Sequence, residues 1–370
     1  MTESVLRAGI IGGGVGRSHA KGYQSNANAQ LVAFCDVDEE KLKTFSSEYH
    51  VPPEGGYTDY RHMLADAHLD IVSVCLPNYL HAEVTIAALE AGVHVICEKP
   101  MATSAAEAQH MIDAAQKADR RLVICYNYRY REDVQWVQRV IKAGTIGAVH
   151  HISATWRRET GIPGRGWFVS KKMAGGGALI DLGVHVLDLA QWLMDFPEVQ
   201  TVSGATRSLF GAHGLKTWGR KPGPMGETQF DVEDGAIGFI RFANGANAVL
   251  QATWAEHRQP QDDLIHIEIQ GAQGTIVLSI ENYTIENTLR LYTEIEGEPV
   301  TIIPGLRASG KAWGHDKFVS ATVDAIHNGT PPPSDGEQGL ADVRVLEAMY
   351  QSALSGHEVS LSAVIAPEHT

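Results

Sequence analysis

Short, continuous apolar runs separated by segments of helix length open the chain. The runs are Val5–Ile11, Gln30–Cys35, Leu69–Pro77, Val93–Cys97 and Leu122–Cys125. Apolar runs that do not alternate with polar residues are typical of parallel strands buried on both faces. The intervening segments 38–48, 79–91 and 104–118 are predicted helices, with Gly92 as a C-cap glycine and Ser104 as an N-cap. This alternation predicts a doubly wound, parallel α/β sheet over residues 1–126.

The pattern changes after Ile146. Strand-like runs follow one another with little helix between them, at 150–159, 200–209, 236–242, 247–255, 265–270 and 275–280. Hairpin signals at Asn244-Gly245 and at Gly271–Gly274 favour antiparallel pairing. Helices are expected at 178–194, 314–327 and 336–355. Residues 127–370 are therefore predicted to form an α+β domain with a large, mostly antiparallel sheet, and its last helices could pack back on the first domain. The Gly/Pro-rich segment 209–230 is predicted to be a substrate lid or an oligomer arm.

Composition narrows the class of protein. The 370 residues are 44% apolar and 20% charged, as expected of about two folded domains. The net charge of −14 argues against a nucleic acid or an anionic membrane as partner. No apolar run approaches the roughly 20 residues of a membrane span, and the first residues do not resemble a signal peptide. These features predict a cytoplasmic enzyme.

The four cysteines each end or nearly end an apolar run. Cys35, Cys75, Cys97 and Cys125 include no Cys-x-x-Cys pair, so neither a zinc site nor a disulfide scaffold is indicated. We interpret them as small buried hydrophobic residues, and we expect no bound metal.

A glycine-rich loop follows the first strand: Gly12, Gly13, Gly14, Val15, Gly16 and Arg17. Glycines there allow a tight turn and a close approach of the backbone to a pyrophosphate. The usual spacing is GxGxxG, whereas this loop reads GxGxG with Arg17 where the third glycine belongs. Asp36, after the second strand, could accept hydrogen bonds from ribose hydroxyls, which favours NAD over NADP. The alternatives are a tight turn without a nucleotide, and an aspartate that only begins a turn.

Two further motifs carry candidate chemistry. Glu98-Lys99-Pro100 follows a strand of the parallel sheet, where a lysine could stabilise an oxyanion or simply be solvated. Asp181 and His185 are four positions apart and share a helix face, so His185 could be a general base near neutral pH. The alternative for Asp181 and His185 is a surface ion pair. As metal ligands they lack a third partner at readable spacing.

Together these segments resemble the Gfo/Idh/MocA family of oxidoreductases. The matching segments are GIIGGGVGRSHA, LPNYLHAE, AALEAGVHVICEKPMA, YNYRY, GGGALIDLGVHVLDLAQWLM and VLEAMYQSALSGHEVSL. The resemblance covers nearly the whole chain and departs from the family at the third glycine of the nucleotide loop. It implies a Rossmann domain that binds NAD, and hydride transfer between nicotinamide and a secondary hydroxyl of a sugar, glycoside or cyclitol.

The resemblance also implies roles for individual residues. Lys99 would stabilise the developing alkoxide, Asp181 would orient the substrate and His185 would be the acid/base. Cofactor contacts would come from Gly12, Gly14, Val15, Gly16, Arg17, Asp36, Pro77, Asn78, His81, Glu98, Lys99 and Asn127. Substrate contacts would come from Lys99, Arg129, Arg157, Arg158, Trp167, Asp181, His185 and His257.

Several of these residues have a structural alternative. His81 could be a helix residue satisfied by its neighbours, and Asn127 and Arg129 could stabilise the domain junction. Arg157 and Arg158 are consecutive in a strand, so at most one of them points inward. Trp254 is predicted to belong to the core.

Three other functions remain open at this point. One is a glycoside-cleaving enzyme with tightly bound NAD, which oxidises, eliminates and re-reduces. The others are an NADP-linked sugar reductase and a non-catalytic sensor, although a sensor would not need Lys99 or His185. The broad antiparallel sheet would leave an exposed face, which predicts a homodimer or homotetramer formed through that sheet.

Overall fold

The computed structural model describes residues 5–163, 166–217, 230–308 and 310–361. The chain divides into two compact units. Unit 1 comprises Met1–Tyr130 and Gly314–Val343, and unit 2 comprises Arg131–Trp313 and Arg344–Thr370. Each unit has its own sheet.

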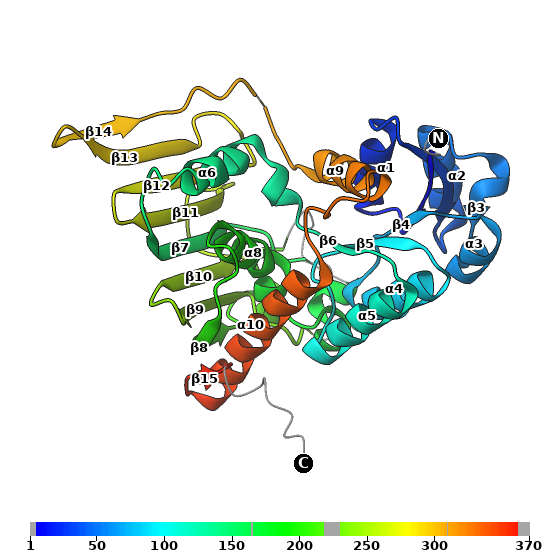
Figure 1. Ribbon diagram of the computed structural model, residues 1–370. Helices are drawn as coiled ribbons and strands as arrows, with labels where there is room; N and C mark the ends of the chain where they lie inside the picture. Colours follow the sequence, from blue (N-terminus) through cyan, green and yellow to red (C-terminus); the bar gives the residue numbers. More distant parts are fainter. Residues whose placement is uncertain (1–4, 164–165, 218–229, 309, 362–370) are drawn as a thin grey trace, which may run out of the picture. The chain divides into compact units, whose positions relative to one another are not determined.

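Unit 1 is built on a six-stranded, all-parallel sheet with the order β3-β2-β1-β4-β5-β6. Its strands are β1 Leu6–Ile11, β2 Ala29–Cys35, β3 Gly56–Tyr57, β4 Ile71–Val74, β5 His94–Glu98 and β6 Leu122–Cys125. Every residue of β4 and β6 is buried, because helices cover both faces of the sheet (Figure 1). The predicted doubly wound sheet is confirmed, and all four cysteines are buried and free.

The α-helices that lie wholly in unit 1, among the described residues, are α1 Gly16–Gln24, α2 Glu39–Tyr49, α3 Tyr60–Asp66, α4 His81–Glu90, α5 Ala105–Ala118 and α9 His315–His327. Of these, α2, α4, α5 and α9 begin and end within two residues of the predicted bounds. Ser104 accepts a hydrogen bond from the Glu107 amide at the start of α5, and Gly92 has φ +81 just beyond α4. Although α9 is distant in sequence, it packs on α1, where a Cβ on Gly22 would lie 2.6 Å from Val319 (Figure 1).

Unit 2 contains a nine-stranded sheet with the order β14-β13-β12-β11-β7-β10-β9-β8-β15. The strands are β7 Val149–Arg158, β8 Val199–Arg207, β9 Gly235–Phe242, β10 Asn247–Thr253, β11 Asp263–Gly271, β12 Gly274–Glu281, β13 Leu289–Ile295, β14 Glu298–Ile302 and β15 Val359–Ser360. All neighbours are antiparallel except β7 and β10. The mostly antiparallel sheet and both hairpins are therefore as predicted, with Gly245 in a positive-φ turn.

The helices of unit 2 lie on one face of this sheet (Figure 1). They are α6 Glu132–Lys142, α7 Lys171–Ala174 and α8 Val184–Leu193, together with the part of α10 Gly336–Ser355 that follows Val343. Strands β10, β11 and β12 show buried residues at alternate positions, which are the positions that face the helices.

Short 3-10 turns occur in both units, at Pro53–Gly55, Asn78–Leu80, Asn127–Tyr130, Gly166–Val169 and Gly211–His213.

The helix predicted at 178–194 is present, with one difference in geometry. Leu179–Gly183 is a π-helical turn that leads into α8. The sequence pattern missed α3, α6, β13 and β14. Most of the predicted lid or arm at 209–230 lies outside the described residues, since the structure describes that segment only up to Thr217 and from Phe230.

The helical stretch Lys171–Leu193 is long and apolar enough to cross a membrane by length and composition alone. However, 83% of its most apolar window is buried inside the structure, as in the core helix of a folded domain. The stretch is therefore part of the core of unit 2.

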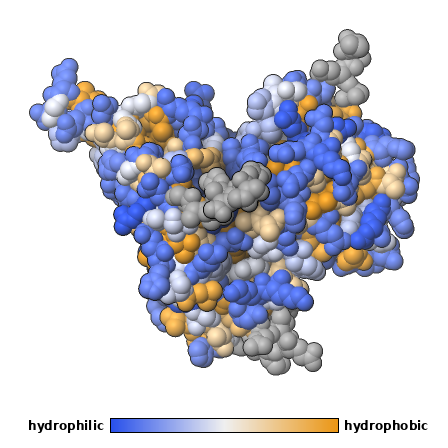
Figure 2. Space-filling model, turned by 60° about the horizontal axis from the view of Figure 1, so that its bottom comes forward, coloured by the Kyte–Doolittle hydropathy of each residue, from blue (hydrophilic) through white to orange (hydrophobic). Residues whose placement is uncertain are grey.

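In the view of Figure 2, hydrophobic residues are interspersed among hydrophilic ones on the surface.

Candidate functional site

In unit 1, the parallel strands bring the predicted cofactor residues to one edge of the sheet. The segment after β1 contains Gly12, Gly14, Val15, Gly16 and Arg17, and Asp36 follows β2. The segment after β4 contains Pro77, Asn78 and His81. Strand β5 ends at Glu98 and is followed by Lys99, and Asn127 comes after β6. Because β1 and β4 are neighbours in the sheet but not in the sequence, the chain reverses its direction of winding between them. Ligands of such sheets bind at the carboxyl ends of the strands at this reversal.

Three of the four glycines of the loop have different structural roles. Gly12 has φ +98, and a Cβ there would lie 2.3 Å from the carbonyl oxygen of Cys75. A Cβ on Gly16 would lie 2.9 Å from Ile10, so Gly16 permits the close packing of α1 on β1. A Cβ on Gly14 would meet nothing within 4 Å. The open space at Gly14, just before the N-terminus of α1, fits a pyrophosphate, and Gly16 supplies the packing usually provided by the third glycine.

Asp36, the residue after β2, hydrogen-bonds to this loop. Its Oδ2 accepts a hydrogen bond of 3.0 Å from the Gly13 amide, and its Oδ1 accepts one of 3.0 Å from the Asp38 amide. These contacts hold the carboxylate beside the glycine loop. The guanidinium of Arg17 is partly exposed and pairs with Glu48, so within unit 1 it already has an anionic partner.

The residues after β4 and β6 are mostly buried. The ring nitrogens of His81 lie 2.7 Å from the Pro100 carbonyl oxygen and 2.8 Å from that of Leu76, and burial lowers the pKa of this histidine. Asn78 and Asn127 are also buried. Arg129 is 1% exposed and donates hydrogen bonds to the Pro333 carbonyl and to Gln338. These contacts favour the structural alternatives for His81 and Arg129.

Glu98 ends β5 and Lys99 follows it, beside a buried polar cluster. Glu98 Oε1 lies 2.8 Å from Nε2 of His19 and 3.8 Å from Nε2 of His315, and Glu98 Oε2 accepts the Lys99 amide at 3.2 Å. Although Glu98 is buried, its hydrogen bond with His19 and the nearby positive charges hold the pKa of its carboxyl well below the usual range. Burial lowers the pKa of His315 to about 4. Glu98 is therefore an anion that contacts the backbone of Lys99.

Among the described residues, His19, Glu98 and Cys125 offer potential metal-ligand atoms within 4.8 Å of one another. However, His19 already hydrogen-bonds Glu98 through one ring nitrogen and Ser73 through the other, at 2.8 and 2.9 Å. The two best ligands thus bind each other, which is the geometry of a hydrogen-bonded cluster rather than of a cage for a cation.

In unit 2, Asp181 and His185 lie on the helical segment formed by the π turn and α8. Asp181 Oδ2 accepts a hydrogen bond of 3.0 Å from the indole of Trp254. His185 is 8% exposed, and its ring centroid is 5.4 Å from that of Trp156. Trp254 is fully buried, as predicted, but the sequence pattern did not reveal that its indole holds Asp181. Because His185 is buried, it does not fit the alternative of a surface ion pair.

The sheet of unit 2 gathers the predicted substrate residues at one edge. Strands β7, β8 and β10 end at the edge where β9 and β11 begin. Arg157 and Arg158 end β7, and Trp254 and His257 follow β10. Because Trp254 binds Asp181, this edge also includes the segment with His185.

The two arginines at the end of β7 differ, as their alternation predicts. Arg158 is 8% exposed, pairs with Asp263 at 2.8 Å and donates to the Tyr283 hydroxyl at 2.7 Å. Arg157 lies on the opposite face of the strand and is less buried. The contacts of Arg158 are those of a core ion pair. Trp167, in a 3-10 turn, stacks on Phe168 with centroids 3.8 Å apart.

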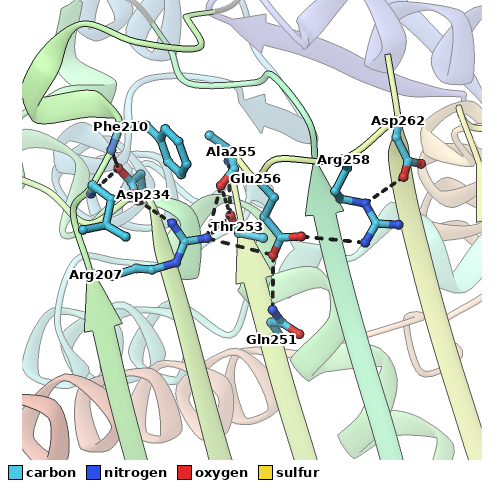
Figure 3. Close-up of polar contacts among 10 residues, drawn as sticks. Arg207, Phe210, Asp234, Gln251, Thr253, Ala255, Glu256, Arg258 and Asp262 are labelled. Atoms are coloured by element: carbon cyan, nitrogen blue, oxygen red, sulfur yellow. Dashed lines mark hydrogen bonds and ion pairs between the residues drawn. The ribbon is translucent and has the colours of Figure 1, made fainter. Parts of the chain in front are cut away.

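A row of alternating charges crosses the same edge (Figure 3). Asp234 pairs with Arg207 at 3.1 Å, and Glu256 lies between Arg207 and Arg258 at 3.9 and 3.7 Å. Arg258 also pairs with Asp262 at 2.7 Å. Asp234 is fully buried and accepts the amides of three consecutive residues, 209–211. Each charge is matched by its neighbours, so the row fixes the loops around His257, which is exposed and lies beside Phe210.

Comparison with known proteins identifies relatives of both units. Residues 6–126 match the model of an oxidoreductase family with an NAD-binding Rossmann fold, and residues 134–277 match the GFO/IDH/MocA C-terminal domain. The chain is 31% identical to D-glucoside 3-dehydrogenase of Escherichia coli over 98% of this chain and 99% of that protein. It is 33% identical to levoglucosan dehydrogenase of Pseudarthrobacter phenanthrenivorans over 75% and 74% of the two chains. The structure of a levoglucosan dehydrogenase in complex with NADH and levoglucosan has a TM-score of 0.82 and 25% identity, covering 96% of this chain and 99% of that one.

Proposed function

The chain belongs to the Gfo/Idh/MocA family of NAD-binding oxidoreductases, and from this premise we propose that it oxidises a secondary hydroxyl of a sugar, glycoside or cyclitol. The observation that carries the proposal is the position of Asp181 and His185. They lie on one helical segment that is joined through Trp254 to the sheet edge where Arg157 and His257 gather.

We propose NAD, rather than NADP, as the cofactor. Gly14 would leave room for the pyrophosphate, and Asp36, held beside the loop by the Gly13 amide, would meet the ribose hydroxyls. A carboxylate at this position would repel a 2′-phosphate. When bound, NAD supplies the hydride acceptor for the oxidation.

The chain's own residues would accept the hydroxyl proton and stabilise the negative charge that develops on the oxygen. His185 would accept the hydroxyl proton, Lys99 would stabilise the alkoxide, and Asp181 would accept a hydrogen bond from a neighbouring substrate hydroxyl.

The substrate class follows from the relatives and from the side chains at the sheet edge. Two relatives act, by name, on a glucoside and on levoglucosan. Arg157, Trp167 and His257 would supply hydrogen bonds and an aromatic surface for a carbohydrate ring. Arg129 and Arg158 have partners within their own units, so we propose that they are structural rather than substrate contacts.

We also propose that the chain assembles as a dimer or tetramer through the nine-stranded sheet. One face is covered by helices, and alternate positions of β9–β12 leave the other face partly exposed, with Ile237 at 49%. Residues 1–126 would bind NAD, and residues 127–370 would bind substrate and form the assembly. The four free, buried cysteines fit a reducing compartment, which supports a cytoplasmic location.

The test is a panel of glucosides, free sugars, levoglucosan and myo-inositol with NAD or NADP, followed by absorbance of NADH or NADPH. Lys99→Ala and His185→Ala should each lower kcat by about 10²-fold or more, while NADH binding, followed by fluorescence, persists. The control is His150→Ala, an exposed histidine near the opposite end of β7. Unchanged turnover in either active-site variant would refute its role. Cleavage of a glycoside without net NADH would favour the glycoside-cleaving alternative.

A further inference from the structure

The segment that carries Asp181 and His185 is capped by a residue far away in the sequence. The first amides of a helical segment have no partner within it. Here the Gly177 amide lies 2.9 Å from each carboxylate oxygen of Glu233, and the Leu179 amide donates to Glu233 Oε1 at 2.9 Å. The Ala178 amide donates to the backbone carbonyl of Glu233 at 3.1 Å. One residue therefore satisfies three consecutive amides.

Tyr350 of α10 completes this cap. Its hydroxyl lies 2.9 Å from Glu233 Oε1. A Cβ on Gly176 would lie 2.0 Å from that hydroxyl oxygen, and a Cβ on Gly177 would lie 1.9 Å from the Glu233 carbonyl oxygen. The cap occupies the space that side chains at 176 and 177 would need. The glycines of this motif are thus required by contacts within the protein.

The capped segment is also the one with unusual geometry. Leu179–Gly183 forms a π turn, a conformation that is rare and is maintained by its surroundings. The Asp181 amide still donates to the Gly177 carbonyl at 3.0 Å, so the position of Asp181 follows directly from the capped residue. No side chain within the segment caps it, since Ala178 stands at the N-cap. An anion from outside is the arrangement that the partial positive charge of a helix N-terminus favours.

We propose that Glu233 and Tyr350 are positioning residues that act through Asp181 and His185, setting the orientation of the two side chains toward the substrate. The inference rests on the proposed function, because the roles of Asp181 and His185 rest on it. Glu233 is 8% exposed and meets the reacting groups only through the backbone of residues 177–181. The next residue, Asp234, accepts the amides of a different segment, residues 209–211 (Figure 3). The two adjacent carboxylates therefore cap two different segments.

The decisive experiment combines Glu233→Gln and Tyr350→Phe with the double variant Asp181→Ala/His185→Ala. Glu233→Gln should lower kcat for the best sugar substrate about 10-fold or more and Tyr350→Phe about threefold or more, with the Kd for NADH within twofold of wild type. In the Asp181→Ala/His185→Ala background the same substitutions should change the residual kcat less than twofold, because both groups through which they act are absent. Equal fold-losses in both backgrounds would overturn the proposal, as would a folded Glu233→Gln enzyme with unchanged kcat. If Glu233→Gln fails to fold, Tyr350→Phe alone decides between these outcomes.

Ser352→Ala is the matched control. Ser352 lies on the same helix as Tyr350, is buried, and accepts a hydrogen bond from the Gly204 amide, away from residues 176–185. It should lose stability without losing kcat.

Amide hydrogen exchange supplies a readout that does not depend on activity. Peptides covering 176–186 should exchange at least 10-fold faster in Glu233→Gln and as in wild type in Ser352→Ala. Unchanged exchange in Glu233→Gln would overturn the cap. If the wild-type protein oxidises no sugar or cyclitol, the proposed function fails, and with it the catalytic consequence of the cap. The exchange result would still decide whether Glu233 holds the segment.

Discussion

Alanine substitutions at Gly12 and Gly14 should separate the structural from the ligand-binding requirement of the glycine loop. The two glycines are two positions apart and the substitution is the same. At Gly12 the backbone has φ +98 and the new Cβ would lie 2.3 Å from the carbonyl oxygen of Cys75, the buried residue that follows β4. At Gly14 the new Cβ would meet no atom within 4 Å.

The magnitudes follow from these two environments. Forcing alanine into a backbone conformation suited to glycine costs roughly 1–3 kcal/mol, and overpacking adds roughly 1–3 kcal/mol. Gly12→Ala should thus reduce the free energy of unfolding by about 4 kcal/mol, which is a large part of the roughly 5–15 kcal/mol of a typical domain. Gly14→Ala should leave it unchanged or raise it by up to about 1 kcal/mol, because alanine reduces the entropy of the unfolded chain.

Thermal unfolding and NADH titration distinguish the two variants. For a unit of this size, about 4 kcal/mol corresponds to a fall in Tm of roughly 8–16 °C for Gly12→Ala. Gly14→Ala should keep the wild-type Tm but bind NADH about 10-fold more weakly or worse, since its methyl group would occupy the space assigned to the pyrophosphate. Wild-type NADH affinity in Gly14→Ala would refute the assignment of that space. Equal Tm values for the two variants would refute the steric argument.

Three other substitutions test separate parts of the molecule. Asp36→Ala should weaken NAD binding and reduce the discrimination against NADP, measured as the ratio of kcat/KM for the two cofactors; an unaltered ratio would exclude Asp36 as the ribose ligand. Burial and the charges of Arg120 and Arg121 lower the pKa of His94 to about 4, so its neutral form is favoured in the fold. Stability from His94 should therefore be complete above about pH 6.5 and be lost as the pH falls toward 4, and His94→Gln should flatten the dependence of Tm on pH in that window. Asp234→Asn should cost roughly 2–3 kcal/mol in urea unfolding, because Arg207 loses its fully buried partner; a smaller loss than that of Ser104→Ala would contradict this.

Most elements of unit 1 were predictable because they are encoded locally. Continuous apolar runs identified β1, β2, β4, β5 and β6, and Ser104 and Gly92 marked helix ends through contacts with residues only a few positions away. Parallel strands then bring their carboxyl ends to one edge, so the glycine loop, Asp36 and Lys99 could be assigned to that edge from their positions alone. Strands β13 and β14 were missed because their residues are largely exposed and their apolar pattern is weak.

The sequence by itself determined the order and type of most elements, the glycine loop after β1 and the position of Asp181 and His185 on one helical segment. Only the tertiary structure decided what each glycine does. It made Gly16, rather than residue 17, the packing glycine, left space at Gly14, and placed Glu233 and Tyr350 against Gly176 and Gly177. It also turned Arg158 inward to Asp263. The reason is physical: a period or a cap depends on neighbours a few residues away, whereas the contacts of Glu233, Tyr350 and Arg158 join residues more than 50 positions apart, and no local pattern records them.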